Sequence, residues 1–205
     1  MCAPDGKQWG AGREALPDVW IQALSDPKTG PPHAAGIAVD WRAAIWGQFG
    51  AAIDSLERAI DACPDELWGD RARNPEYWYL VYHTLFWLDY YTSDTEEGFA
   101  PPAPFTRSEM DPAGVLPDRV YTRDEMRRYL EHGREKARGR IDAMTDEKAS
   151  GTRRLGSRNE GSELELLLYN LRHVQHHTAQ LNLILRQVTD SAPGWVGRTN
   201  RPLRA

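Results

Sequence analysis

Residues 74–92 read NPEYWYLVYHTLFWLDYYT, and apolar side chains occupy nearly every position of this stretch. Its length favours a helix over a strand, and Asn74 followed by Pro75 is a typical helix start. A helix that is apolar on almost every side has to be buried on almost every side. The stretch therefore predicts the most buried helix of the fold.

Three more stretches, residues 39–63, 122–144 and 162–188, carry apolar residues at intervals of three and four. This spacing is typical of one face of an α-helix. Four amphipathic helices with one long connection predict an all-α fold, a four-helix bundle. The expected end signals are a cap at Asp40, a stop at Pro64, and two capping boxes, Thr122 with Glu125 and Ser162 with Glu165.

The regions outside these helices divide the chain into three parts. Residues 1–36 are rich in Gly, Pro and Ala and predict an irregular N-terminal arm, residues 37–190 form the helical domain, and residues 191–205 form an irregular tail. The proline-containing segment 93–120 is a long loop between the second and third helices. Such a loop is either a functional lid or a strap that covers the helices.

Composition excludes several classes of protein. The net charge of -5 offers no basic field for nucleic acid, so we expect no nucleic-acid partner. We find no signal peptide and no apolar run long enough to span a bilayer, so we expect no membrane partner. Cys2 and Cys63 form no disulfide framework, which indicates a reduced, cytoplasmic protein.

Three of the six histidines fall in one five-residue stretch, 173–177, of the predicted fourth helix. On a helical wheel at about 100° per residue, His177 lies inside the apolar arc and His173 lies at its edge. His176 points away among polar positions. We therefore expect His173 and His177 to form an inward i, i+4 pair and His176 to be exposed.

An i, i+4 pair can offer two nitrogen ligands to one metal ion, or it can be a pair of core histidines with hydrogen-bond partners. Two ligands hold a metal poorly, so a third is needed. His83, in the middle of the most apolar helix, is the candidate. His33 and His132 lie in the arm and on the charged third helix, and neither is expected to take part.

These motifs together resemble the DinB/YfiT-like superfamily. The resemblance rests on His83 within YWYLVYHTLFWLDYY and on HxxxH within NLRHVQHHTAQLNLILRQ, in that order, and covers roughly residues 38–190. It implies a four-helix bundle of up-down-down-up topology that is often dimeric, so we expect a homodimer. It also implies a divalent metal ion, zinc or nickel, held by His83, His173 and His177.

The resemblance implies a class of activity, but it does not identify the substrate. The family includes S-transferases that use bacillithiol, mycothiol or glutathione, and mycothiol-dependent maleylpyruvate isomerases. We therefore expect a metal-dependent enzyme, S-transferase-like, with a low-molecular-weight thiol and an unknown small-molecule substrate. The alternatives are a metal-dependent hydrolase of small substrates and a non-catalytic metal-binding or dimerisation bundle.

Other side chains are weaker candidates around the site. Val174 occupies the position of the glutamate in HExxH, which argues against a zincin-type protease. Asn170 and Gln180 could orient the histidines, although interhelical hydrogen bonding is the favoured interpretation for Gln180. Glu76 and Asp89 are candidates for hydrogen-bonding the ligands, and Arg42, Arg71 and Arg73 are candidates for binding a carboxylate of a thiol cofactor. A group of aromatic residues either lines a substrate pocket or belongs to the core: Trp46, Tyr79, Phe86, Trp87 and Tyr90.

Overall fold

The computed structural model describes residues 40–155 and 159–204. Helices make up most of this part, so the expected all-α class is confirmed. The predicted arm at residues 1–36 lies outside the described residues, and its boundary stays a prediction. The four long helices are α2 (Trp41–Ala62), α4 (Tyr77–Tyr91), α5 (Arg123–Asp142) and α7 (Glu163–Thr189).

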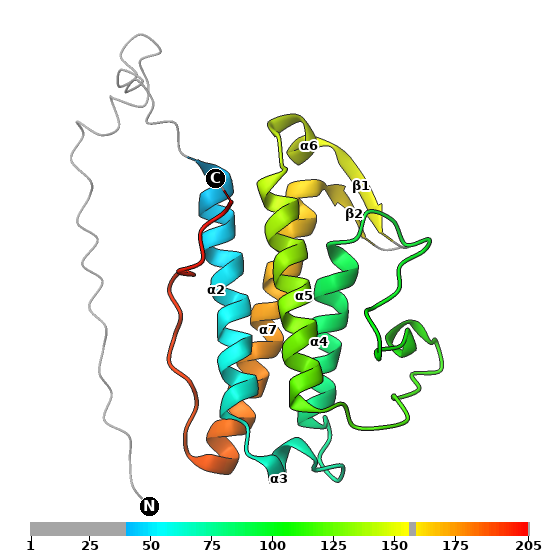
Figure 1. Ribbon diagram of the computed structural model, residues 1–205, viewed down its shortest axis with the longest axis vertical. Coiled ribbons are helices and arrows are strands. Elements are labelled where there is room, and N and C mark those ends of the chain that lie inside the picture. The colour runs from blue at the N-terminus through cyan, green and yellow to red at the C-terminus, as the bar shows by residue number, and fades with distance from the viewer. Residues whose placement is uncertain (1–39, 156–158, 205) are drawn as a thin grey trace, which may run out of the picture. The chain divides into compact units, whose positions relative to one another are not determined.

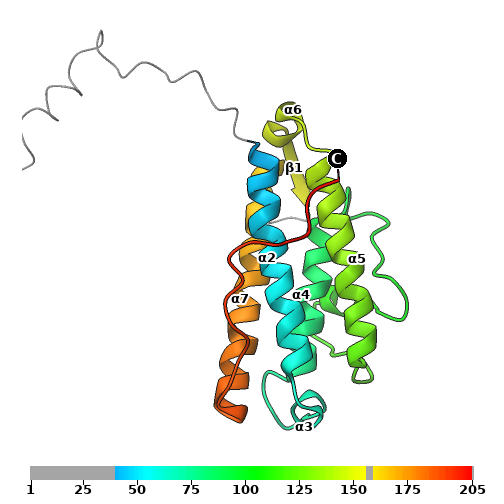
Figure 2. The same cartoon turned by 60° about the vertical axis from the view of Figure 1, so that its left-hand side comes forward.

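The four long helices lie side by side, and α2 and α4 each pack on both α5 and α7 (Figures 1 and 2). In Figure 1, α2 and α7 run downward whereas α4 and α5 run upward. Because α4 and α5 run in the same direction, the chain has to travel from the end of α4 back to the level of its start before α5 can begin. The 15 residues of α4 make this distance about 22 Å. This geometry explains why the chain needs the long segment 93–120.

The helix ends follow the expected signals with one exception. The Asp40 side chain accepts hydrogen bonds at the start of α2, and both capping boxes are present. Asn74 and Pro75, however, do not begin α4. Glu76 has an extended backbone (φ -64°, ψ 138°), which separates Pro75 from the helix, and α4 begins at Tyr77.

Five short elements join the long helices, and the sequence pattern did not predict them. They are α3 (Asp65–Trp68), the 3₁₀ turn η1 (Ser108–Met110), α6 (Asp146–Ser150), β1 (Thr152–Leu155) and β2 (Asn159–Ser162). Strands β1 and β2 form an antiparallel hairpin in which Thr152 pairs with Ser162. These elements are too short and too polar to show a hydrophobic period.

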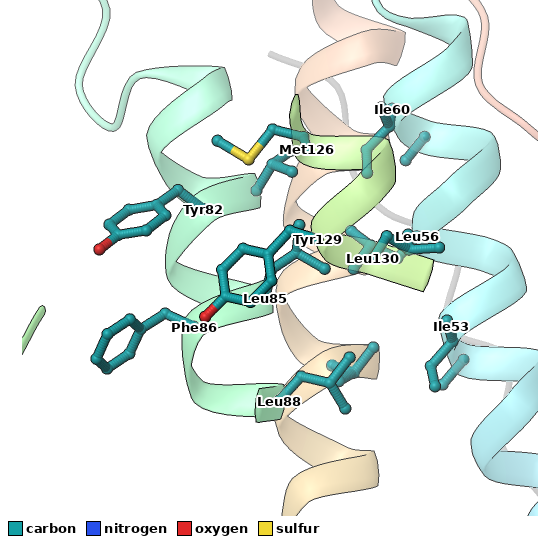
Figure 3. Close-up of a cluster of buried hydrophobic side chains, with 14 of the residues drawn as sticks. Ile53, Leu56, Ile60, Tyr82, Leu85, Phe86, Leu88, Met126, Tyr129 and Leu130 are labelled. Atoms are coloured by element: carbon teal, nitrogen blue, oxygen red, sulfur yellow. The ribbon is translucent and has the colours of Figure 1, made fainter. Parts of the chain in front are cut away.

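The core lies between the four helices, and Figure 3 shows the side chains of α2, α4 and α5 that meet there. As expected, α4 is the most buried: 12 of its 15 residues are buried. The three half-buried exceptions are Tyr79, His83 and Trp87, four residues apart. One stripe of α4 is therefore partly open to solvent, and His83 is at its centre. Among the described residues, none of the helices combines the length and apolar character that a membrane span requires.

Segment 93–120 packs over α4 and α5 rather than standing free. The hydroxyl of Tyr82 donates to the carbonyl of Thr106 at 2.7 Å. The ring of Phe105 stacks on Tyr129 with centroids 4.3 Å apart. The segment is thus a strap over the helices, and it also brings the carboxylate of Glu109 to the open stripe of α4.

The tail lies along α2, and none of residues 191–204 is in a helix or strand. The Thr199 amide donates to the carbonyl of Gly47 at 3.0 Å, and Trp46 Nε1 donates to the carbonyl of Arg201 at 2.6 Å. A Cβ at Gly50 would come within 2.5 Å of the Thr199 methyl group. The absence of a side chain at Gly50 therefore lets the tail come close to α2.

Candidate metal centre

Three histidines meet where α4 packs on α7. His83 comes from α4, and His173 and His177 come from successive turns of α7. One ring nitrogen from each forms a set in which all atoms lie within 4.8 Å of one another. Nε2 of His83 and Nε2 of His173 are 3.3 Å apart. His176 is exposed, so the predicted inward and outward positions on α7 are confirmed.

Hydrogen bonds fix the orientation of two of the three rings. Nδ1 of His83 is 2.6 Å from a carboxylate oxygen of Glu109, which as an ionised group can only accept. Nδ1 of His177 is 2.7 Å from the amide oxygen of Gln180, which also accepts. Both Nδ1 atoms therefore carry a proton, and neither Nε2 atom takes part in these two bonds. A hydrogen-bonded Nδ1 and an open Nε2 are typical of a metal-ligating histidine.

The spacing of the nitrogens suits a small divalent ion. Tetrahedral zinc holds imidazole nitrogens at about 2.0–2.1 Å, which places them roughly 3.3–3.4 Å from each other. The separation of 3.3 Å between His83 and His173 agrees with that edge. Nδ1 of His173 is buried and has no hydrogen-bond partner among the described residues. This cluster is thus not satisfied as an ordinary set of core hydrogen bonds, and it can hold a metal ion.

Burial and the neighbouring histidines favour the neutral form of His173 and His177. Burial, followed by the neighbouring His177 and His83, lowers the pKa of His173 from 6.5 to about 3. Burial also lowers the pKa of His177, against the effect of its bond to Gln180. Burial alone would raise the pKa of Glu109, but the hydrogen bond and charge of His83 outweigh it and the pKa is lowered. The site thus pairs two neutral imidazoles, those of His173 and His177, with the ionised carboxylate of Glu109.

A comparison with models of protein families identifies the family of this chain. The model of the DinB superfamily matches residues 48–181, well over half of the 205-residue chain. The chain belongs to the DinB superfamily. The matched range includes all three clustered histidines. Comparisons with curated proteins and with solved structures found no match.

Aromatic rings flank the histidines of this DinB-superfamily chain. The rings of Tyr79 and Trp87 lie 6.4 and 6.3 Å from that of His83, between centroids. Tyr91 presents its ring to His173 at 6.1 Å. Of the five aromatics proposed from the sequence, Tyr79 and Trp87 therefore border the site. Trp46, Phe86 and Tyr90 are buried in the core.

Of the two polar candidates on α7, Gln180 departs from its favoured interpretation, and Asn170 forms an interhelical hydrogen bond. Gln180, interpreted as an interhelical hydrogen-bonding residue, holds His177 instead. Asn170 is fully buried, and its amide donates to the carbonyl of Leu88 on α4 at 3.1 Å. The wheel places both residues one turn from a ligand, and it cannot tell which neighbour a side chain reaches.

The acidic and basic candidates lie in other contacts. Glu76 accepts from Trp78 Nε1 and pairs with Arg71 at 3.2 Å. Asp89 contacts Tyr129, His132 and Lys136, rather than the clustered histidines. Within the described ranges, Arg42, Arg71 and Arg73 make no hydrogen bond or ion pair with the three histidines. The interpretations of Glu76 and Asp89 as partners of the ligands are therefore wrong.

Sequence reasoning missed Glu109, the carboxylate that holds His83. It lies on η1 within segment 93–120, 26 residues after its partner. Trp87 Nε1 donates to the same oxygen at 3.1 Å, and the Glu109 side chain is only 4 % exposed. The segment also contains Asp94, Glu96 and Glu97. Nothing in the linear pattern separates Glu109 from these acids, because the fold of the strap alone selects it.

Replacing Glu109 by alanine is expected to weaken metal binding about 10–100-fold, the usual effect of removing a group that orients a ligand. The Glu109→Gln variant keeps an acceptor for His83 Nδ1 and should fall between wild type and alanine. Competition with a chromophoric chelator measures the affinity. Glu97→Ala is the matched control, because Glu97 is an exposed acid of the same segment. Equal affinity in Glu109→Ala and Glu97→Ala would show that Glu109 does not orient His83.

Proposed function

We propose that this protein is a metal-dependent enzyme, most closely an S-transferase that uses a low-molecular-weight thiol on a small-molecule substrate. Its fold is then the up-down-down-up four-helix bundle of the DinB/YfiT-like type. His83, His173 and His177 would hold one divalent ion, zinc or nickel. The observation that carries the proposal is the convergence of three ring nitrogens within 4.8 Å of one another. Burial also lowers the pKa of two of these imidazoles, His173 and His177.

Three neutral ligands leave a divalent ion its full charge, and the ion when bound lowers the pKa of a coordinated thiol or water toward neutrality. The chain's own groups prepare this position. Glu109 and Gln180 keep the protons of His83 and His177 on Nδ1, away from the ion. The rings of Tyr79 and Trp87 border His83 on the partly open stripe of α4, so a small substrate can approach between them.

Two observations favour thiol transfer over hydrolysis. A metal-dependent hydrolase usually needs a general base that can reach the reacting water. Val174 follows His173 on α7, so no glutamate stands in the zincin position. Glu109 is the carboxylate that hydrogen-bonds a clustered histidine, and its Oε2 already accepts from both His83 and Trp87. It is held as a positioning group.

The test is a thiol-conjugation assay with protein purified without a histidine tag. Bacillithiol, mycothiol and glutathione are each offered with an electrophile such as 1-chloro-2,4-dinitrobenzene, with zinc or nickel present. We expect one thiol to react faster than its uncatalysed rate with wild type, and the gain to disappear in His83→Ala. Thiol-independent cleavage of a nitrophenyl ester would instead indicate a hydrolase. Bound metal without either reaction would favour a non-catalytic site.

We also propose that the protein is a homodimer, as the family resemblance implies. Several apolar side chains of α7 are exposed, among them Leu168 at 41 % and Leu183 at 52 %. Exposed apolar side chains gathered on one helix are common at interfaces between copies. Light scattering coupled to size-exclusion chromatography measures the mass, and a monomer at micromolar concentration would contradict this state.

A further inference from the structure

A pocket apart from the histidine cluster lies at the end of the described helices where α4 and α5 finish and α7 begins. Its volume is about 560 Å³, and α6 and β1 complete its walls. This volume is within the range of small-molecule sites. Thr92 on its wall is nine residues beyond His83, about 13 Å along the helix axis. The pocket is thus separate from the histidine cluster.

Positive charge predominates around this pocket. Of the described residues that line it, four are basic and two are acidic. Both acids are engaged by the same arginine, since Arg140 pairs with Glu163 and with Asp94. The basic residues are Lys136, Arg140, Lys148 and Arg153, and the acidic ones are Asp94 and Glu163.

Two of the guanidinium groups share one buried carboxylate. Arg140 and Arg153 both contact Glu163. Burial, followed by the like charge of Arg140, lowers the pKa of Arg153. The Arg153 side chain is 9 % exposed, and its Nε is buried without a hydrogen-bond partner among the described residues. Glu163 and Asp94 match the charges of the two arginines, but Arg153 Nε still lacks an acceptor.

The two lysines differ in their partners. Lys136 is neutralised from within the fold, because its ammonium contacts Asp89 and Ser93. Lys148 has no carboxylate partner among the described residues. Its ammonium donates to the carbonyl of Ala143 at 3.5 Å, and the side chain is exposed. Lys148 is therefore a cation at the pocket without a matching acid.

We propose that this pocket binds a small anion through its oxyanion oxygens, which belong either to a carboxylate or to a phosphate. Arginine forks pair with such oxyanions in a bidentate way, and lysine adds a point charge. A bound oxyanion would supply the partner that Lys148 and Arg153 Nε lack. This site is independent of the proposed metal-dependent activity, because the two sets of residues do not overlap.

Isothermal titration calorimetry of the full chain tests the proposal with succinate and with inorganic phosphate as probes. Sodium chloride at equal ionic strength controls for screening. We expect saturable binding of at least one probe, and the preferred probe identifies the oxyanion as carboxylate or phosphate. Absence of saturable binding for both would overturn the proposal. His83→Ala should bind the probe like wild type, whereas loss of binding there would place the anion at the metal instead.

Lys148→Gln should weaken the probe about tenfold, the effect of losing one charge-assisted hydrogen bond. Lys148→Arg should retain binding, and far-ultraviolet circular dichroism checks that both variants are folded. The matched control is Arg128→Gln, which removes an exposed cation of α5 that is 12 residues from Arg140, about 18 Å along the helix axis. Equal weakening in Lys148→Gln and Arg128→Gln would show only a net-charge effect and would contradict a site in this pocket.

Discussion

Protein purified without a histidine tag is expected to contain about one divalent ion per chain, and alanine at any of the three clustered histidines should abolish it. Each replacement leaves two imidazoles, too few for the three protein ligands that open metal sites usually have. Each of the three residues offers one ligand atom, so none of them supplies the nitrogen that another loses. Inductively coupled plasma mass spectrometry measures the stoichiometry after incubation with zinc or nickel.

His176→Ala is the control for this experiment. Its ring lies 5.0 Å from that of His177, yet the side chain is exposed and outside the cluster. It should bind metal like wild type. A wild-type protein that stays metal-free after incubation would contradict the proposed function, and loss of metal in His176→Ala as well would contradict the assignment of ligands.

Replacing Asp89 by asparagine is expected to lower the free energy of unfolding by about 3 kcal/mol, as for other broken buried ion pairs. The Asp89 side chain is 1 % exposed and lies between α4 and α5. It accepts from the Tyr129 hydroxyl at 3.2 Å and contacts the ammonium of Lys136. The variant keeps the shape of the side chain but leaves Lys136 without its counter-charge. Urea denaturation followed by circular dichroism measures the loss.

The same carboxylate makes stability depend on pH. Burial would raise the pKa of Asp89, but His132 and Lys136 outweigh it and lower the pKa below the ordinary 3.8. A lowered folded-state pKa adds stability above pH 3.8, and this stability is lost as the pH falls through the folded value. Between pH 5 and pH 3, wild type should therefore lose more stability than Asp89→Asn.

Asp94→Asn is the matched control for Asp89. Asp94 also contacts a basic residue of α5, Arg140, at 2.8 Å, but its side chain is 94 % exposed. Exposed ion pairs contribute roughly 0–1 kcal/mol, so this variant should unfold almost like wild type. Equal losses in the two variants would show that burial of Asp89 does not determine its contribution.

The sequence was informative where a regular period places side chains. The apolar pattern of residues 74–92 predicted the buried helix, and the wheel separated His176 from His173 and His177. His83 could be proposed because a titratable side chain stands out on an apolar helix. In each of these cases one helix defines the surroundings of the residue.

The sequence was uninformative where a segment without a period supplies the contact. Glu109 reaches His83 from the strap, and Arg153 reaches Glu163 from β1. Gln180 and Asn170 lie on a helix, but the choice of partner depends on side-chain reach and on the neighbouring helix. Such contacts follow from tertiary packing, which no local pattern records.

The strap has a thermodynamic role that follows from its contact with His83. Glu109 belongs to the segment between α4 and α5, so one hydrogen bond contributes both to holding this segment on the helices and to aiming His83 Nε2. Two equilibria that share a contact are linked, and the linkage acts equally in both directions. Loading the histidines with an ion would therefore favour the docked strap, and an undocked strap would release the ion more readily. Residues 93–120 would thus help to set the lifetime of a bound ion.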